Sequence, residues 1–290
     1  MNTKYIEFKK KRELGDILSD TFAFLRYNYK PLFSILMKTA GIPFILVLAA
    51  TAYYTASTGD LLSPESLQSG AAFATGNILI SVLLLAVTVL VFYGLLFGTV
   101  LNYIKVYIQQ KGEVQQDLVI QGVKKDWGGI IGLAILSGIM IGVGFMFCII
   151  PGIYLYVPLS LVFTVMVFRN KDVSDSITES FQLVKNEWWM TFATLLVMGI
   201  VVGIIGAVFT IPSMIYMFIN GIVSAEQGSA ADLSGMFDWV YVTLNTIASA
   251  IRFLLYIITA IATAFIYFNL NERKNLTGTF EKIDALGKSE

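Results

Sequence analysis

The residues that could support binding or chemistry gather in one segment, 173–189, with the sequence VSDSITESFQLVKNEWW. On a helix, Asp175, Glu179 and Lys185 share one face, and Trp188 and Trp189 follow at the end. Carboxylates and a lysine at this spacing are typical of a solvated helix face. A tryptophan pair is typical of the depth of lipid headgroups. We therefore expect this segment to contact a partner and not to carry out catalysis.

The rest of the composition offers little catalytic chemistry. The chain has no histidine, so the commonest general base, the commonest zinc ligand and every histidine-dependent triad are excluded. Its one cysteine, Cys148, lies in an apolar run and is expected to pack in the core. No Walker loop, Cys/His cluster, paired-carboxylate motif or nucleophile elbow occurs. The sequence predicts a protein that is not an enzyme and has no catalytic residues, cofactor or metal.

The segment 173–189 also has an apolar stripe. Its members recur at steps of four, four, three and four, as one helix face requires: Val173, Ile177, Phe181, Val184 and Trp188. A helix of this kind lies along a membrane surface with the stripe facing the bilayer.

Composition places most of the chain in a bilayer. Hydrophobic residues make up 56% of the 290 positions and charged residues 14%, well under the roughly 25% usual in soluble domains. The pattern predicts an all-α, polytopic membrane protein. Its six expected transmembrane helices cover 32–54, 78–107, 128–150, 153–168, 190–211 and part of 239–268.

The predicted organisation is a single membrane domain over residues 1–290. It comprises a basic segment and an interfacial helix (1–31), a six-span bundle (32–268) and a soluble tail (269–290). Pro31 is expected to close the first interfacial helix, because the residue before a proline avoids helical dihedrals. Pro151 and Gly152 are expected to form the turn between the third and fourth spans.

The distribution of charge predicts the topology. Loops 55–75 and 221–238 contain none of the 20 Lys and Arg residues but hold five carboxylates: Asp60, Glu65, Glu226, Asp232 and Asp238. The positive-inside rule then places both termini in the cytoplasm. The membrane is expected to be a bacterial inner membrane. The basic run at the start is expected to bind anionic lipid, and it consists of Lys9, Lys10, Lys11 and Arg12. A net charge of zero argues against a nucleic-acid partner.

The amphipathic pattern recurs along the chain. A shift of 159 residues superimposes 173–188 on 14–29 with every stripe position filled, and a weaker copy occupies 108–127. We therefore expect a three-fold pseudo-repeat of an interfacial helix followed by a two-span hairpin. The alternative is that any interfacial helix before a span has this pattern.

A few other charged residues and glycines lie within the expected spans or at their ends. Arg252 either lies mid-bilayer, where it would mark a pathway or a partner, or reaches the outer interface. Lys38 and Lys105 are expected to anchor span ends. Glycines recur at a spacing of four (128/132, 138/142 and 199/203) and predict close helix packing, within one bundle or in a dimer.

One region resembles a known family. Pro151-Gly152 opens a span, and the run from Glu179-Ser180-Phe181 to Leu183-Val184-Lys185 ends in Trp188-Trp189. These features resemble the membrane domain associated with glycerophosphoryl diester phosphodiesterases and related uncharacterised bacterial membrane proteins. In such enzymes catalysis resides in a separate barrel domain that this chain lacks. The resemblance therefore implies a membrane fold and no reaction.

Three functions follow as hypotheses. The first is a non-enzymatic membrane scaffold or assembly partner, whose cytoplasmic collar of amphipathic helices binds membrane lipids and a protein partner. The second is a channel-like or lipid-handling transporter. The third, implied by the resemblance alone, is an accessory subunit of a lipid-head-group enzyme.

Overall fold

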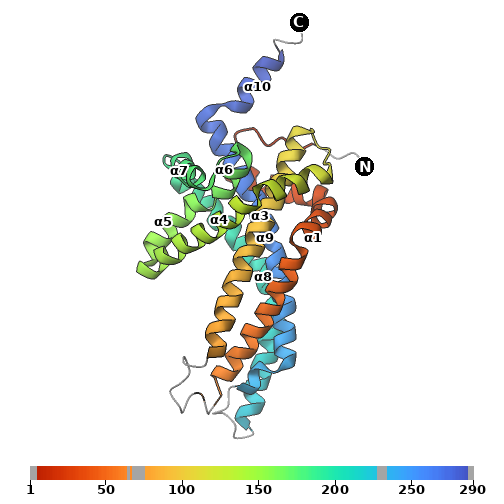
Figure 1. Cartoon of the computed structure of the whole chain (residues 1–290), viewed down its shortest axis with the longest axis vertical. Helices are drawn as coiled ribbons and strands as arrows, with labels where there is room; N and C mark the ends of the chain where they lie inside the picture. The colour runs from red at the N-terminus through yellow and green to blue at the C-terminus, as the bar shows by residue number, and fades with distance from the viewer. Residues whose placement is uncertain (1–4, 64–65, 67–75, 227–233, 287–290) are drawn as a thin grey trace. The chain divides into compact units, whose positions relative to one another are not determined.

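The computed structural model describes residues 5–63, 66, 76–226 and 234–286 (Figure 1). Regular structure in these residues is entirely helical. The elements are α1 (Leu14–Leu61), α3 (Gly76–Gln109), α4 (Gln116–Phe147), α5 (Ile149–Leu159), α6 (Val162–Arg169), α7 (Val173–Val184), α8 (Trp188–Glu226), the 3-10 helix η1 (Ser234–Phe237), α9 (Trp239–Asn275) and α10 (Thr277–Leu286).

Six helical segments of the described chain are long and apolar enough to cross a membrane. They are Leu14–Leu61, Asn77–Gln109, Gln116–Phe147, Ile149–Arg169, Trp188–Ser224 and Trp239–Asn275. Each contains or overlaps one predicted span. The expected all-α fold with six transmembrane helices is therefore confirmed, and the chain is a multi-pass membrane protein.

The chain divides into two compact units, whose boundaries fall within α1, α3, α8 and α9. Unit 1 comprises Met1–Ala40, Tyr93–Val201 and Ile257–Glu290, and unit 2 comprises Gly41–Phe92 and Val202–Tyr256. A single membrane domain over residues 1–290 stays a prediction. The basic run 9–12 and the candidate residues of segment 173–189 belong to unit 1, and Arg252 belongs to unit 2.

The core of unit 1 encloses a non-helical segment, residues 5–13, which we call the N-terminal strap. Phe8 of the strap is fully buried. Its ring stacks on Phe265 at a centroid distance of 4.3 Å and meets Phe24 edge-on at 5.2 Å. The backbone N–H of Ile6 donates a hydrogen bond to the hydroxyl of Tyr107 at 2.9 Å. The strap therefore joins α1, α3 and α9 within unit 1.

The break expected at Pro31 is wrong, because α1 continues through it from Leu14 to Leu61. Proline removes one backbone donor but is tolerated within membrane helices. One face of α1 stays buried on both sides of Pro31, through Phe24, Asn28 and Leu32. Continuous packing on this face explains why the dihedral preference does not end the helix.

The turn of the α4–α5 hairpin lies at Cys148 and not at Pro151-Gly152, which belong to α5 (Figure 1). Cys148 has extended dihedrals, with φ −172° and ψ 153°. Pro151 follows within the first turn of α5, where its missing N–H has no intrahelical partner to lose. The thiol of Cys148 is exposed at this turn, so the prediction that it packs in the core is also wrong.

The interfacial helices differ from one another. Residues 173–184 form the separate helix α7, whereas residues 14–29 begin α1 and residues 116–127 begin α4, each without a break before its span. The three-fold repeat stays a prediction. The tail expected from 269 is helical from its start, because α9 runs to Asn275 and α10 follows.

The expected loops are shorter than predicted on their described sides. Helix α1 extends to Leu61, and α8 extends to Glu226. Asp60 is exposed, and Asp238 accepts a hydrogen bond from the hydroxyl of Tyr216 at 2.5 Å. Glu65 and Asp232 lie outside the described residues.

Of the predicted glycines, Gly132 lies against another helix, since a Cβ there would be 3.5 Å from Val173 Cγ2 of α7, but the tightest helix packing uses glycines that were not predicted. A Cβ at Gly128, Gly142, Gly199 or Gly203 would meet nothing within 4 Å. In contrast, a Cβ at Gly94 would lie 3.2 Å from Ala134 Cβ, and one at Gly98 would overlap the side chain of Ile130. The absence of side chains at Gly94 and Gly98 therefore allows α3 and α4 to approach closely within unit 1.

Candidate functional site

Helix α7 begins and is held in place by specific contacts. Asp172 caps its start, because the Asp172 carboxylate accepts a hydrogen bond from the backbone N–H of Asp175 at 2.9 Å. Val173, Ile177 and Phe181 pack against a buried cluster of α4, α5 and α6 that includes Ile130 and Val162. The stripe that was expected to face the bilayer therefore packs largely against protein.

The two carboxylates of α7 have different surroundings. Glu179 forms an ion pair with Arg169 at the end of α6. Arg169 also donates hydrogen bonds to the Tyr267 hydroxyl at 3.0 Å and to Asn271 Oδ1 at 2.8 Å, both on α9. Asp175 is exposed and lies 3.6 Å from Lys171 Nζ, four residues earlier. Glu179 thus ties α7 to α6 and α9, and only Asp175 remains on the open surface.

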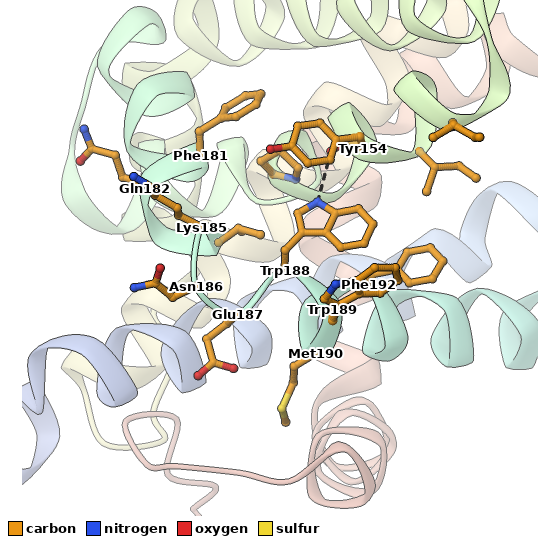
Figure 2. A pocket seen from close by; sticks show the side chains of 14 residues that line it. Tyr154, Phe181, Gln182, Lys185, Asn186, Glu187, Trp188, Trp189, Met190 and Phe192 are labelled. Carbon is orange, nitrogen blue, oxygen red and sulfur yellow. Dashed lines mark hydrogen bonds between the residues drawn. The ribbon is translucent and has the colours of Figure 1, made fainter.

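A cavity of about 960 Å³ opens where α5, α7 and the start of α8 meet, and we call it the tryptophan pocket. Trp188 lies between two rings (Figure 2). It stacks on Tyr154 at a centroid distance of 5.7 Å and on Phe192 at 5.3 Å, and its Nε1 donates a hydrogen bond to the Tyr154 carbonyl at 3.4 Å. Trp189 packs edge-on against Trp188 and is 77% exposed. The predicted tryptophan pair therefore forms part of the wall of an open aromatic cavity.

The polar side of the pocket comes from the turn between α7 and α8. The lining residues of this turn are Lys185, Asn186 and Glu187, and Gln182 at the end of α7 lies beside them. Glu187 Oε1 lies 3.4 Å from Arg273 Nη1 of α9. Lys185 is exposed and forms no ion pair with any carboxylate in the described residues. The pocket thus combines apolar walls with one cation that is available to a ligand.

The described part of the chain places no cluster of metal ligands at this pocket. Among those residues, no group of three or more His, Cys, Asp or Glu side chains could hold a metal ion. The groups that the arrangement does provide are aromatic faces, amides and one free ammonium. These groups suit the binding of an amphipathic ligand.

The four basic residues of the strap differ in exposure and pairing, and the binding of anionic lipid by this run stays a prediction. Arg12 is fully buried and forms an ion pair with Asp20 at 2.9 Å. Burial lowers the pKa of its guanidinium from the ordinary value, and the Asp20 carboxylate opposes this change. Lys9 pairs with Glu281 of α10, and Lys10 lies 3.4 Å from Asp20. Only Lys11 is exposed without an ion pair to a described carboxylate.

Arg252 lies in unit 2, on α9, with an exposed side chain. No described carboxylate forms an ion pair with it. Both interpretations of Arg252, a charge within the bilayer and a charge at the outer interface, stay predictions.

Sequence reasoning missed the partners that complete these sites. Tyr154 lies 34 residues before Trp188, and no periodic pattern connects the two. Lys105 was interpreted as an anchor, but its ammonium donates hydrogen bonds to the Val167 carbonyl and to Asn170 Oδ1, each at 2.7 Å. In the sequence, Lys105 is a lone cation near the end of an apolar helix. This pattern fits an interfacial anchor as well as a lysine that is hydrogen-bonded within the protein.

Comparison with known proteins identifies no family: no family model, curated protein or solved structure matches the chain. The resemblance to the phosphodiesterase-associated membrane domain therefore stays a prediction.

Proposed function

We propose that this multi-pass membrane protein is a non-enzymatic scaffold that binds a protein partner in the tryptophan pocket. The observation that carries the proposal is the open aromatic cavity at the junction of α5, α7 and α8. Exposed aromatic side chains surrounded by polar groups are characteristic of binding hot spots. The contacts of α7 with α4, α5, α6 and α9 support a rigid wall for such a site.

The proposed occupant is an amphipathic helix of the partner with an acidic residue beside its apolar face. The apolar side would lie on Trp188, Trp189 and Tyr154, as in other helix-in-groove complexes. Lys185 would then pair with the acidic residue, because it is exposed and has no described carboxylate partner.

In this proposal the pocket belongs to a cytoplasmic collar made of α7 and the ends of its neighbours. The positive-inside rule supports this placement, since Lys and Arg are absent from 55–75 and 221–238 and frequent elsewhere. The same rule supports cytoplasmic termini, and the proposed membrane is a bacterial inner membrane.

Trp188→Ala is expected to weaken partner binding by about thirtyfold, because truncating a central aromatic anchor costs about 2 kcal/mol or more. Lys185→Glu is expected to weaken it by at least about tenfold through charge repulsion. The measurement is affinity purification of the tagged full chain in mild detergent, with quantitative mass spectrometry of the proteins that are retained.

Two controls separate the pocket from other surfaces. Trp239→Ala removes an exposed tryptophan of unit 2, and Lys11→Glu reverses an exposed lysine outside the pocket. Both variants should retain the partner at wild-type stoichiometry. Recovery of the wild-type protein without a stoichiometric partner, or of the same partners with all four variants, would contradict the proposal.

A second candidate function is lipid handling, and one observation favours it. The α4–α5 hairpin ends in strongly exposed apolar residues next to the pocket, with Phe147 84% and Ile150 77% exposed, and Ile150 also lines the pocket. A lipid acyl chain could enter along this path. Recovery of stoichiometric phospholipid and no protein from the same purification would favour this candidate.

A further inference from the structure

Unit 1 contains a second cavity, of about 490 Å³, among the strap, α3, α6, α9 and α10. We call it the basic cavity. It shares no lining residue with the tryptophan pocket. Lys9, Lys105 and Arg169 line it together with a single carboxylate, Glu281. Lys9 pairs with Glu281, and Arg169 pairs with Glu179, which does not line the cavity. Lys105 is therefore the cation of this wall that forms no ion pair with a described carboxylate.

Lys105 holds the least compensated of these charges. Its Nζ lies 2.7 Å from both the Val167 carbonyl and Asn170 Oδ1, which are neutral acceptors. Asp126 attracts this ammonium only at longer range, since no described carboxylate forms an ion pair with it. Two of the three donors of an ammonium are thus occupied, and the third is left for a ligand.

The α9 residues that line the cavity include amides whose orientation is fixed by hydrogen bonds. Asn271 Oδ1 accepts hydrogen bonds from Arg169 at 2.8 Å and from Asn275 Nδ2 at 2.7 Å, and Asn271 Nδ2 donates to Thr277 at 2.9 Å. These bonds hold Arg169 and Asn275 at the cavity in one arrangement. Because an amide nitrogen has two hydrogens, Asn275 retains one donor.

We propose that the basic cavity binds the phosphate group of an anionic ligand. Lysine, arginine and amide donors line this site, and Lys105 forms no ion pair with a described carboxylate. Such donors provide the chemistry that phosphate oxygens require. Phe168, Tyr267 and Phe268 line the same cavity, so the phosphate would have apolar side chains beside it. A free phosphate and the headgroup of an anionic phospholipid share this chemistry, and the experiment below distinguishes them.

The test measures two ligands on the purified full chain. Thermal unfolding in detergent is followed with inorganic phosphate, against chloride at the same ionic strength. Native mass spectrometry counts bound phosphatidylglycerol, against zwitterionic phosphatidylcholine. We expect at least one of these ligands to bind the wild type. Binding of phosphate would raise the melting temperature, because a ligand specific for the folded state stabilises that state. Lys105→Gln is expected to weaken that binding by about tenfold, since it removes a charge-assisted hydrogen bond.

Two further variants keep the outcome decisive. Lys38→Gln removes a lysine that donates to Gln116 at 2.8 Å outside the cavity, and it should bind like the wild type. Asn275→Ala removes only the amide donor, so it tests the site if Lys105→Gln fails to fold. Binding of phosphate identifies a free phosphate ligand, and binding of phosphatidylglycerol alone identifies a lipid headgroup. Binding of neither ligand, or wild-type binding by both Lys105→Gln and Asn275→Ala, would overturn the proposal.

Discussion

Replacing Arg12 with alanine should lower the free energy of unfolding by about 3 kcal/mol, because it breaks a buried ion pair. The guanidinium is fully buried and Nε donates to Asp20 at 2.9 Å. The other two guanidinium nitrogens donate to the backbone carbonyls of Glu7, Phe8 and Lys10. The guanidinium carbon, Cζ, lies 4.6 Å from the centroid of the Phe265 ring. Alanine would leave these carbonyls without the donors that satisfy them.

Thermal unfolding in detergent measures this effect, and the melting temperature should fall by about 6–12 °C. Lys11→Ala is the matched control, because Lys11 directly precedes Arg12 in the chain and is exposed. The control should melt within about 1–2 °C of the wild type, as surface substitutions usually do. Equal melting temperatures for Arg12→Ala and Lys11→Ala would contradict the structural role of the strap.

Replacing Phe8 with alanine is expected to cost about 3–5 kcal/mol, the usual range for removing a buried aromatic ring. Phe8 contacts four rings: Phe24, Tyr107, Phe265 and Phe268. The loss would leave a void in this cluster and would also loosen the segment that carries Arg12.

Phe280→Ala provides the comparison for Phe8→Ala, since it deletes the same side chain at an exposed position of α10. It should change the melting temperature by no more than about 1–2 °C. The double variant of Phe8 and Arg12 should be less destabilised than the sum of the two single variants, because both residues contact Phe265. A Phe8→Ala protein as stable as Phe280→Ala would show that the strap does not belong to the folded core.

The sequence predicted the features that depend on local composition. Apolar runs of sufficient length predicted the six transmembrane helices, because each run must satisfy its backbone within its own helix. The period-3.6 spacing of the apolar stripe indicated α7, and the structure confirms a helix from Val173 to Val184. These signals lie within one segment, so a single sequence contains them.

Features that depend on distant contacts were not predictable in the same way. In the sequence, Arg12 cannot be distinguished from the three lysines before it. Its contacts with Asn269, Asp20 and Phe265 distinguish it, and they form only in the folded structure. Glu179 resembles Asp175 until Arg169 pairs with it. Gly94 and Gly98 give the same spacing as the predicted glycine pairs, and only their position opposite Ile130 distinguishes them.

The contacts of α7 explain why the tryptophan pocket can keep its shape. Glu179 joins α7 to Arg169, and Glu187 after the helix approaches Arg273 of α9 at 3.4 Å. Lys274 of α9 also donates to the Gln182 carbonyl at 3.4 Å. A preorganised wall reduces the conformational entropy lost on binding, which favours partner affinity.

Site-specific photo-cross-linking in cells tests the proposed scaffold function most directly. A photo-reactive phenylalanine analogue would replace Trp189, which is exposed at the pocket, and in a second protein it would replace the exposed Trp239 of unit 2. We predict a specific protein adduct from position 189 that is absent from position 239 and is lost when Lys185→Glu is added. No protein adduct at position 189, or an adduct that persists with Lys185→Glu, would contradict the account.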